Sequence, residues 1–254
     1  MSILESLLAH PLTRGLSVDD PRTTALRRAI IQEKTFLRSI YSEWYARLIV
    51  ALPQGGRVLE LGAGAGFLAD VYPAAITSEV FHTPGISLVA DARDLPFPDE
   101  ALAAIVMTDV FHHIPDVKMF LTESARCIGA GGKLLMIEPW RTRWSEWIYT
   151  RLHSEPFVPG ADWNIPATGP LSGANGALPW IVFHRDRAAF ETLFPDWRVV
   201  RIEPMMPFAY LLSGGVSMRA FMPGWAYGVI RRLEACLDQS RWGMFAYIEL
   251  ERCS

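Results

Sequence analysis

The chain has 254 residues, of which 50% are hydrophobic, and its mean hydropathy is +0.17. This length suits one α/β domain with insertions. A net charge of -3 and a pI near 6.1 provide no basic surface for a phosphate backbone, so we expect no nucleic-acid partner. No apolar run is long enough to span a bilayer, and the first residues do not resemble a secretory signal, so we expect a cytoplasmic protein.

The cysteines point to the same compartment. Cys127, Cys236 and Cys253 are odd in number and lack the spacing of metal ligands. This pattern favours free thiols in a reducing environment over a disulfide framework or a zinc site. We therefore expect no metal site.

The first predicted element is helical. In residues 24–52, apolar side chains recur at helical spacing, with a charged interruption at Glu33 and Lys34, which predicts either one bent helix or two helices. The part QEKTFLRSIYSEWYARL could close over a ligand as a lid, or it could pack against the core as an ordinary helix.

The middle of the chain has the rhythm of parallel strands joined by crossovers. From residue 57 to residue 137, short β-rich runs alternate with turns or helical segments such as residues 116–128. The runs are RVLELG, AAITSEV, ISLVAD, AAIVMTD and KLLMIEP. After Trp140 we expect helices at residues 141–153 and 185–194, then the strands WRVVRIEP and MFAYIELER. The final strand, near residues 244–252, is predicted to run antiparallel in a mostly parallel sheet.

The run VLELGAGAGF, at residues 58–67, joins a buried strand to a glycine turn. Glycines at such a turn let a ligand approach the backbone. The dinucleotide fingerprint G-x-G-x-x-G also follows a first strand, but here the third glycine comes one residue early and Phe67 stands where Gly or Ala is needed. Glu60, two residues before Gly62, suits a ligand that carries an ammonium group and no phosphate. S-adenosylmethionine is such a ligand.

Together with this turn, two further segments carry a family resemblance: VADARDLPFPDEALAAIVMTDVFHHIPD and GAGGKLLMIEP. Over roughly residues 56–140, the sequence resembles the class I S-adenosylmethionine-dependent methyltransferases, in the broad small-molecule group often called type 11. The resemblance implies a Rossmann-like three-layer α/β sandwich that uses S-adenosylmethionine and releases S-adenosylhomocysteine. We expect a single domain with a helical cap at residues 1–53, a cofactor-binding core at 54–140 and a C-terminal part at 141–254 with substrate-side insertions.

The resemblance also implies which residues bind the cofactor. The glycine turn would lie against the methionine and ribose, Glu79 would accept from the ribose hydroxyls, and Asp91 with Ala92 would hold the adenine edge. Residues 109–113 would lie beneath the methionine moiety. The full set is Glu60, Gly62, Ala63, Gly64, Gly66, Glu79, Val80, Asp91, Ala92, Asp109 and Val110. At Gly64, a valine is expected to occupy the volume of the ligand.

One segment departs from the family pattern. Between Glu79 and Asp91 the family usually has a whole helix, but EVFHTPGISLVAD is a short link that contains Pro84 and Gly85. We therefore expect no regular helix at residues 80–87.

The candidate catalytic residues are His153, His113 and Glu155. Methyl transfer is an in-line displacement that depends mainly on alignment, and a base is needed only when the acceptor holds its proton firmly. His153 is the first candidate for this base, although it could instead order the loop by pairing with Glu155. Of the adjacent His112 and His113, only one is expected to face the cofactor, and His112 is expected to point away.

Motifs that the sequence lacks exclude some classes of methyl acceptor. It has neither the [DN]PP[YF] pattern of amide and adenine methylation nor a Pro-Cys pair for cytosine C5, so a small-molecule or lipid-like acceptor remains, methylated at a hydroxyl or another heteroatom. Residues 204–230 form an apolar insertion with Arg219 as its only formal charge. The body of the protein, a second subunit or an apolar substrate could cover it.

If an apolar substrate covers residues 204–230, this insertion would be a lid over the acceptor pocket. The protein would then meet its acceptor at a membrane surface. Two other functions stay open. One is a protein that binds S-adenosylmethionine without catalysis, and the other is a nicotinamide-dependent oxidoreductase. The sequence does not determine the oligomeric state.

Overall fold

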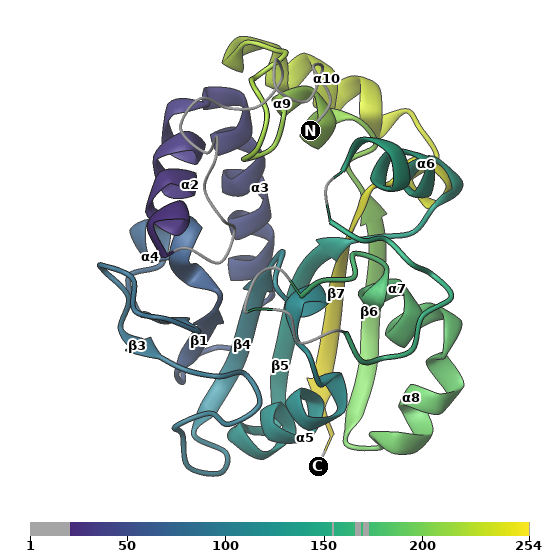
Figure 1. The fold of residues 1–254 in the computed structure, drawn as a ribbon. Helices are drawn as coiled ribbons and strands as arrows, with labels where there is room; N and C mark the ends of the chain where they lie inside the picture. The colour runs from purple at the N-terminus through teal and green to yellow at the C-terminus, as the bar shows by residue number, and fades with distance from the viewer. Residues whose placement is uncertain (1–20, 154, 166–168, 170–172, 254) are drawn as a thin grey trace.

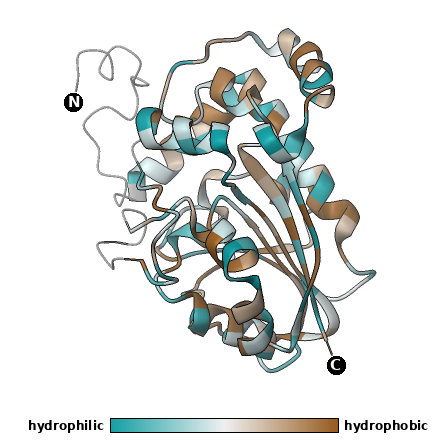
Figure 2. Ribbon diagram, turned by 90° about the vertical axis from the view of Figure 1, so that its right-hand side faces the viewer, coloured by the Kyte–Doolittle hydropathy of each residue, from teal (hydrophilic) through white to brown (hydrophobic). Residues whose placement is uncertain are grey.

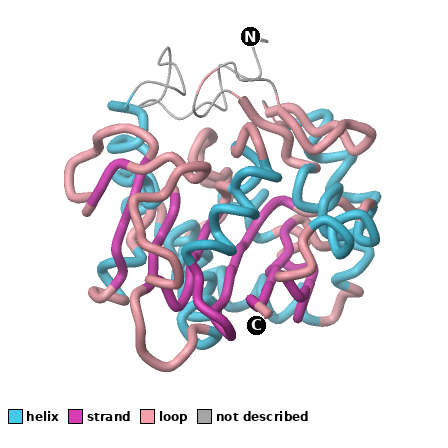
Figure 3. The backbone as a smooth tube through the Cα atoms, turned by 90° about the horizontal axis from the view of Figure 1, so that it is seen from below, coloured by secondary structure: helices cyan, strands magenta, loops and turns pink. Residues whose placement is uncertain are grey.

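The computed structural model describes residues 21–153, 155–165, 169 and 173–253, and these form a seven-stranded sheet with helices on both faces (Figures 1 and 3). The strand order is β3-β2-β1-β4-β5-β7-β6. The strands are β1 (Val58–Leu61), β2 (Ala75–Glu79), β3 (Leu88–Val89), β4 (Leu102–Thr108), β5 (Ile128–Pro139), β6 (Trp197–Met205) and β7 (Phe245–Arg252).

The direction of the last strand is as predicted. β7 pairs antiparallel with both β5 and β6, while the pairs among β1 to β5 are parallel. In Figure 1, β7 runs in yellow between the teal β5 and the green β6. This arrangement confirms the predicted α/β class, with a mostly parallel sheet and an antiparallel final strand.

The described helices surround this sheet. They are α2 (Pro21–Glu33), α3 (Thr35–Ala51), α4 (Leu68–Val71), α5 (Val117–Cys127), α6 (Arg143–Leu152), α7 (Leu178–Trp180), α8 (Arg187–Leu193), α9 (Ala209–Ser213), α10 (Tyr227–Ala235) and α11 (Gln239–Trp242). Apolar residues follow the strands through the middle of the molecule (Figure 2). None of these helices combines the length and the apolar character that crossing a membrane requires.

The predicted helical stripe is two helices, because the chain breaks at Lys34 between α2 and α3. The Lys34 side chain is buried, and its Nζ donates hydrogen bonds to the carbonyl oxygens of Gly215 and Met218, at 2.5 and 2.9 Å. This lysine therefore ties the start of α3 to the insertion at residues 204–230.

Side-chain caps set the starts of two helices near the carboxyl ends of the strands. Asp116 accepts from the backbone N–H of Met119 at the start of α5. Thr142 and Ser145 form a reciprocal capping box at the start of α6. These caps fix where the loops after β4 and β5 turn back, and the loop after β4 and helix α6 contribute to the site described below.

The link after β2 contains no helix, as predicted. β2 and β3 pair in parallel, with Ser78 beside Leu88, and residues 80–87 between them form turns and bends. Gly85 adopts a φ of +88° in this link. The short connection fits because β3 has only two residues and lies at the edge of the sheet.

Candidate active site

A cavity of about 940 Å³ opens at the carboxyl ends of β1, β2 and β4. Glu60 and Leu61 of β1, Glu79 of β2 and Thr108 of β4 all contribute to its wall. In open α/β sheets, ligands bind outside the carboxyl ends of the strands. The cavity is therefore where the fold places a ligand.

The glycine turn forms one wall. Gly62 has a φ of +69°, which favours glycine, and a Cβ at this position would overlap the Val110 side chain. Gly62 therefore lets the turn after β1 lie directly against the turn after β4. Of the predicted cofactor-binding residues, those that line the cavity are Glu60, Gly62, Gly66, Glu79, Val80, Asp91, Ala92, Asp109 and Val110.

Ala63 and Gly64 of the predicted set are buried behind this wall and do not line the cavity. A Cβ on Gly64 would meet the methyl group of Thr24 and the carboxylate of Glu79. The expected reason for glycine here was therefore wrong, because helix α2 and Glu79, not a ligand, fill the adjacent space. A valine at this position would push α2 away from the turn.

The carboxylates in this wall differ in their electrostatics. Burial raises the pKa of Glu60 to about 8, and nearby Glu79 adds to this while Arg28 opposes it. Burial also raises the pKa of Glu79, whose Oε2 accepts from the Val80 N–H at 2.9 Å. Glu60 therefore stays largely protonated at neutral pH until a cation approaches it.

Asp91 has the opposite character. Its carboxylate accepts from the backbone N–H and the Nε of Arg93, each at 2.9 Å, and this hydrogen bonding lowers its pKa. An ionised Asp91 at the cavity wall can accept hydrogen bonds from a ligand amine.

The turn after β4 is strained and rigidly held. Asp109 has a φ of +64°, which is uncommon for a residue other than glycine. Glu138 of β5 is fully buried, and its Oε1 accepts from the N–H groups of Val110 and Phe111, both at 2.8 Å. The second carboxylate oxygen lies 2.7 Å from His112 Nδ1. Glu138 therefore organises the turn instead of facing the cavity.

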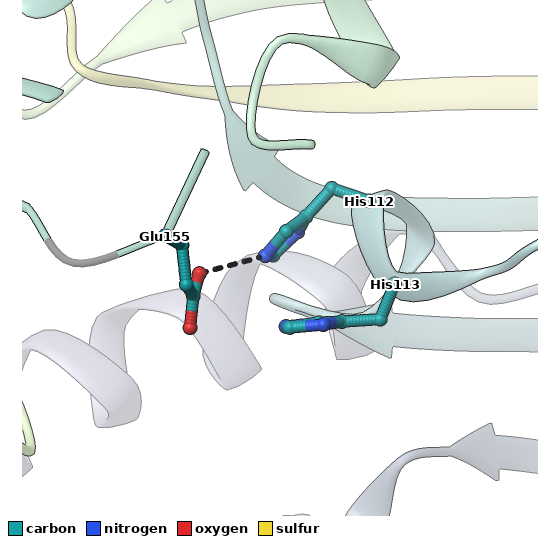
Figure 4. Close-up of side chains that lie close together, drawn as sticks. All are labelled: His112, His113 and Glu155. Atoms are coloured by element: carbon teal, nitrogen blue, oxygen red, sulfur yellow. Dashed lines mark ion pairs between the residues drawn. The ribbon is translucent and has the colours of Figure 1, made fainter. Parts of the chain in front are cut away.

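The two adjacent histidines have different surroundings. His112 is fully buried, whereas His113 lines the cavity, which agrees with the expectation that only one of them faces the ligand. Yet His112 does not point away from the site. Its Nε2 lies 3.5 Å from Glu155 Oε2 (Figure 4), and Glu155 lines the cavity.

His113 and His153 present different ring nitrogens. His113 Nδ1 lies 3.2 Å from the carbonyl oxygen of Gly173, which can only accept, so Nδ1 carries the proton and Nε2 keeps its lone pair. Burial lowers the pKa of His113 to about 4. His153 Nδ1 instead accepts from the Glu155 N–H at 3.3 Å. This contact supports the alternative that His153 orders the loop that carries Glu155.

The same cavity also has an aromatic and apolar lining. Tyr210, Leu211 and Phe221 from the insertion line it, together with residues 214–218 and with Tyr149 of α6. The insertion therefore borders the cavity, as the lid hypothesis requires. Tyr210 also stacks on Trp44 of α3 at a centroid distance of 5.8 Å.

Sequence reasoning missed several cavity residues. Tyr41 and Tyr45 of α3 line the cavity, and Tyr149 joins them from α6, with its hydroxyl donating to the Met244 carbonyl. Arg27 of α2 lines it as well. The apolar stripe predicted α3 but could not show that its tyrosines face a ligand, because one helical face serves both purposes.

A family model described as a methyltransferase domain matches residues 33–172. The chain belongs to this family. It is also similar to two curated proteins: a fatty-acid O-methyltransferase of Mycolicibacterium smegmatis, 35% identical over 100 residues, and a probable phthiotriol/phenolphthiotriol dimycocerosates methyltransferase 2 of Mycobacterium ulcerans, 34% identical over 96 residues. The matches cover 32% and 31% of this chain, and 36% and 37% of those proteins.

A solved structure agrees on the fold. An S-adenosylmethionine-dependent methyltransferase of Thermotoga maritima, described as a possible histamine N-methyltransferase, has a TM-score of 0.52 at 15% identity, with 84% of this chain and 89% of that chain covered. At this identity the likeness shows the fold alone. Family and fold together define an S-adenosylmethionine-dependent methyltransferase domain, which confirms the predicted class.

Proposed function

We propose that this protein transfers the methyl group of S-adenosylmethionine to an apolar small-molecule or lipid-like acceptor, at a hydroxyl or another heteroatom. The observation that carries this proposal is one cavity of about 940 Å³ whose lining combines two kinds of surface. The glycine turn and the carboxylates at the strand ends contribute to its lining, and so do tyrosines and the apolar insertion. A cofactor and an acceptor can therefore share one cavity.

The cofactor would occupy the end formed by β1, β2 and β4. Glu60 would face the ammonium group, Glu79 the ribose hydroxyls and Asp91 the adenine amine, in agreement with the roles that the family resemblance implies. Asp109 and Val110 would support the methionine moiety, because both line the cavity next to the glycine turn.

The acceptor would enter between α6 and the insertion. Its nucleophilic atom must meet the methyl carbon in line with the departing sulfur, so the fixed position of the acceptor supplies much of the rate. His113, His153 and Glu155 line the same cavity. Among them His113 has a ring nitrogen with a free lone pair that can take a proton from a hydroxyl, since His153 Nδ1 already accepts from the backbone.

Two of the relatives support an apolar acceptor, because their names specify a fatty acid and dimycocerosate lipids. The chain spans only about a third of their length in these matches, so the acceptor belongs to the proposal. Free cysteines in the described residues favour the cytoplasm. Exposed Trp225 and Phe221 would let the insertion contact a membrane surface that carries the acceptor.

A ligand panel tests the cofactor first. S-adenosylhomocysteine at a hundred times its dissociation constant should stabilise the protein by about 2.7 kcal/mol, and NAD should not. Stabilisation by NAD alone would favour an oxidoreductase.

Methyl-labelled S-adenosylmethionine then tests transfer to long-chain fatty acids, phenolic lipids and quinols, with water-soluble phenols as the matched polar acceptors. We expect label in the organic-extractable product. If S-adenosylhomocysteine binds but no acceptor class takes label, the protein is a cofactor-binding protein without this activity.

A further inference from the structure

Three side chains beside the cavity form a compact donor cluster, and two of them, His113 and Glu155, line it. His112, His113 and Glu155 each offer one ligand atom, and these atoms lie within 4.8 Å of one another (Figure 4). The histidines come from the turn after β4, and Glu155 from the loop after α6. Because two separate loops supply the donors, no spacing motif in the sequence announces the cluster.

The first observation beyond the cluster itself is a buried ring nitrogen that makes no hydrogen bond and has only a long ion-pair contact. His112 is fully buried, yet its Nε2 has no hydrogen-bond partner among the described residues. A buried polar atom without a partner is costly and calls for an explanation. Its nearest acidic neighbour, Glu155 Oε2, lies 3.5 Å away, longer than a charge-assisted hydrogen bond of about 2.7–2.9 Å.

The second observation is that the other nitrogen of each histidine is already oriented. His112 Nδ1 lies 2.7 Å from Glu138, and His113 Nδ1 lies 3.2 Å from the Gly173 carbonyl oxygen. Histidines that bind metals typically donate their second ring N–H to a carboxylate or a backbone carbonyl, which fixes the tautomer. Both histidines have such a partner, and each keeps one nitrogen for a ligand.

The spacing also fits an ion. With metal–ligand bonds of about 2.1 Å, two donors on a tetrahedral ion lie roughly 3.4 Å apart. The separation of 3.5 Å between His112 Nε2 and Glu155 Oε2 matches this value. The other donor atoms of the cluster also lie within 4.8 Å of one another, so small shifts of His113 or Glu155 would bring them to the same ion. Both face the cavity and are only partly buried, so they have room to move.

We propose that His112, His113 and Glu155 bind one divalent transition-metal ion of the zinc type, with an open position toward the acceptor. This proposal rests on the proposed methyl transfer and replaces the expectation that the protein has no metal site. Two imidazoles and one carboxylate suit Zn²⁺, Co²⁺ or Fe²⁺ better than Mg²⁺, which prefers oxygen ligands.

An ion here gives the acceptor oxygen a defined place. A zinc-type ion here would make the acceptor hydroxyl more acidic, so that its proton could pass to solvent. The deprotonated oxygen would then form the O–C bond as the S–C bond breaks. The bonding electron pair stays on sulfur, which yields S-adenosylhomocysteine. In this scheme His113 is a metal ligand and not the base.

The competing explanation is a buried ion pair without metal, in which a protonated His112 bridges Glu138 and Glu155. The two explanations differ on His113. The ion pair does not use the His113 side chain, whereas the metal site loses one of three ligands without it. The variant His113→Ala therefore separates them.

The test uses the full chain after chelator treatment and removal of the chelator. Calorimetric titration with ZnCl₂ and the visible ligand-field spectrum with CoCl₂ report binding without any enzyme assay, and MgCl₂ serves as the matched weak ion. The variants are His113→Ala and Glu155→Gln, with His82→Ala as a control for an exposed histidine elsewhere. S-adenosylhomocysteine binding and thermal unfolding are measured for every variant to verify the fold.

We expect the protein to bind one equivalent of Zn²⁺, and the Co²⁺ spectrum to be that of an ion with few ligands. The affinity for Zn²⁺ should fall by more than about a hundredfold in His113→Ala and Glu155→Gln, and should not change in His82→Ala. Wild-type protein that binds S-adenosylhomocysteine but shows neither zinc heat nor a cobalt spectrum would overturn the metal site and leave the proposed function intact. Equal zinc affinity in wild type and His113→Ala would overturn it as well. A wild-type protein that does not bind S-adenosylhomocysteine would instead refute the proposed function.

Discussion

The raised pKa of Glu60 predicts that cofactor affinity depends on pH. In the free protein this carboxyl group is buried and has a pKa of about 8, so it is mostly protonated at pH 6 and half ionised near pH 8. An ammonium group beside it binds the ionised form. The apparent dissociation constant is the intrinsic one divided by the ionised fraction, so affinity should rise roughly fiftyfold between pH 6 and pH 8 and then level off.

The assay is calorimetric titration with S-adenosylhomocysteine at pH 6, 7 and 8, in buffers of different ionisation enthalpy that count released protons. Glu60→Gln is the matched variant, because it keeps the shape and removes the titration. The ligand ammonium titrates equally in both proteins, so the difference between their pH profiles isolates Glu60. Wild-type and Glu60→Gln profiles with the same slope would refute the reasoning.

Glu60 should also make the stability of the ligand-free protein depend on pH, but in the opposite direction, so that stability falls as pH rises. Its pKa is higher in the folded protein than the ordinary value of 4.5, so its contribution to the free energy of unfolding is complete at low pH and is lost as pH rises through about 8. Glu60→Gln should remove this decline from the ligand-free protein.

Three further predictions follow from single contacts. Gly62→Ala should lower the free energy of unfolding by more than the roughly 1–2 kcal/mol of left-handed backbone strain, because the new methyl group also overlaps Val110. Gly55→Ala is the control, because Gly55 has a similar φ but open space around it, so only the strain should appear. Equal losses for the two variants in chemical denaturation would contradict this. Lys34→Met should weaken acceptor binding in titrations more than S-adenosylhomocysteine binding, since it releases the insertion from α3, and equal effects on both ligands would argue against it. Asp91→Ala should weaken S-adenosylhomocysteine binding by about 1.5–3 kcal/mol, and an unchanged dissociation constant would remove this residue from the adenine pocket.

Much of the fold was predictable because local patterns decide it. Alternating β-rich runs and short crossovers predict parallel strands, and the short link with Pro84 and Gly85 excludes a helix after β2. Whether residues 24–52 form one helix or two was not predictable, because Lys34 is placed by contacts with the distant carbonyls of Gly215 and Met218.

The lining of the cavity was predictable where a residue's position follows from its own strand end or turn. Glu60 and Asp91 lie at strand ends and line the cavity as expected. Gly64 shows the limit, because Thr24 from a helix far along the chain fills the space beside it. The cluster around His112 also escaped prediction, since Glu138 and Glu155 approach it from two other segments.

Helix α3 has a consequence for how ligands come and go. The helix borders the cavity through Tyr41 and Tyr45, but five of its other side chains are buried in the core: Phe36, Leu37, Ile40, Trp44 and Leu48. Exposing them would cost about 1.5–3 kcal/mol each. Movement of α3 away from the core would therefore be too rare to open the cavity. The exchange of cofactor, acceptor and product would then depend on movement of other segments at the cavity entrance, while α3 stays in place.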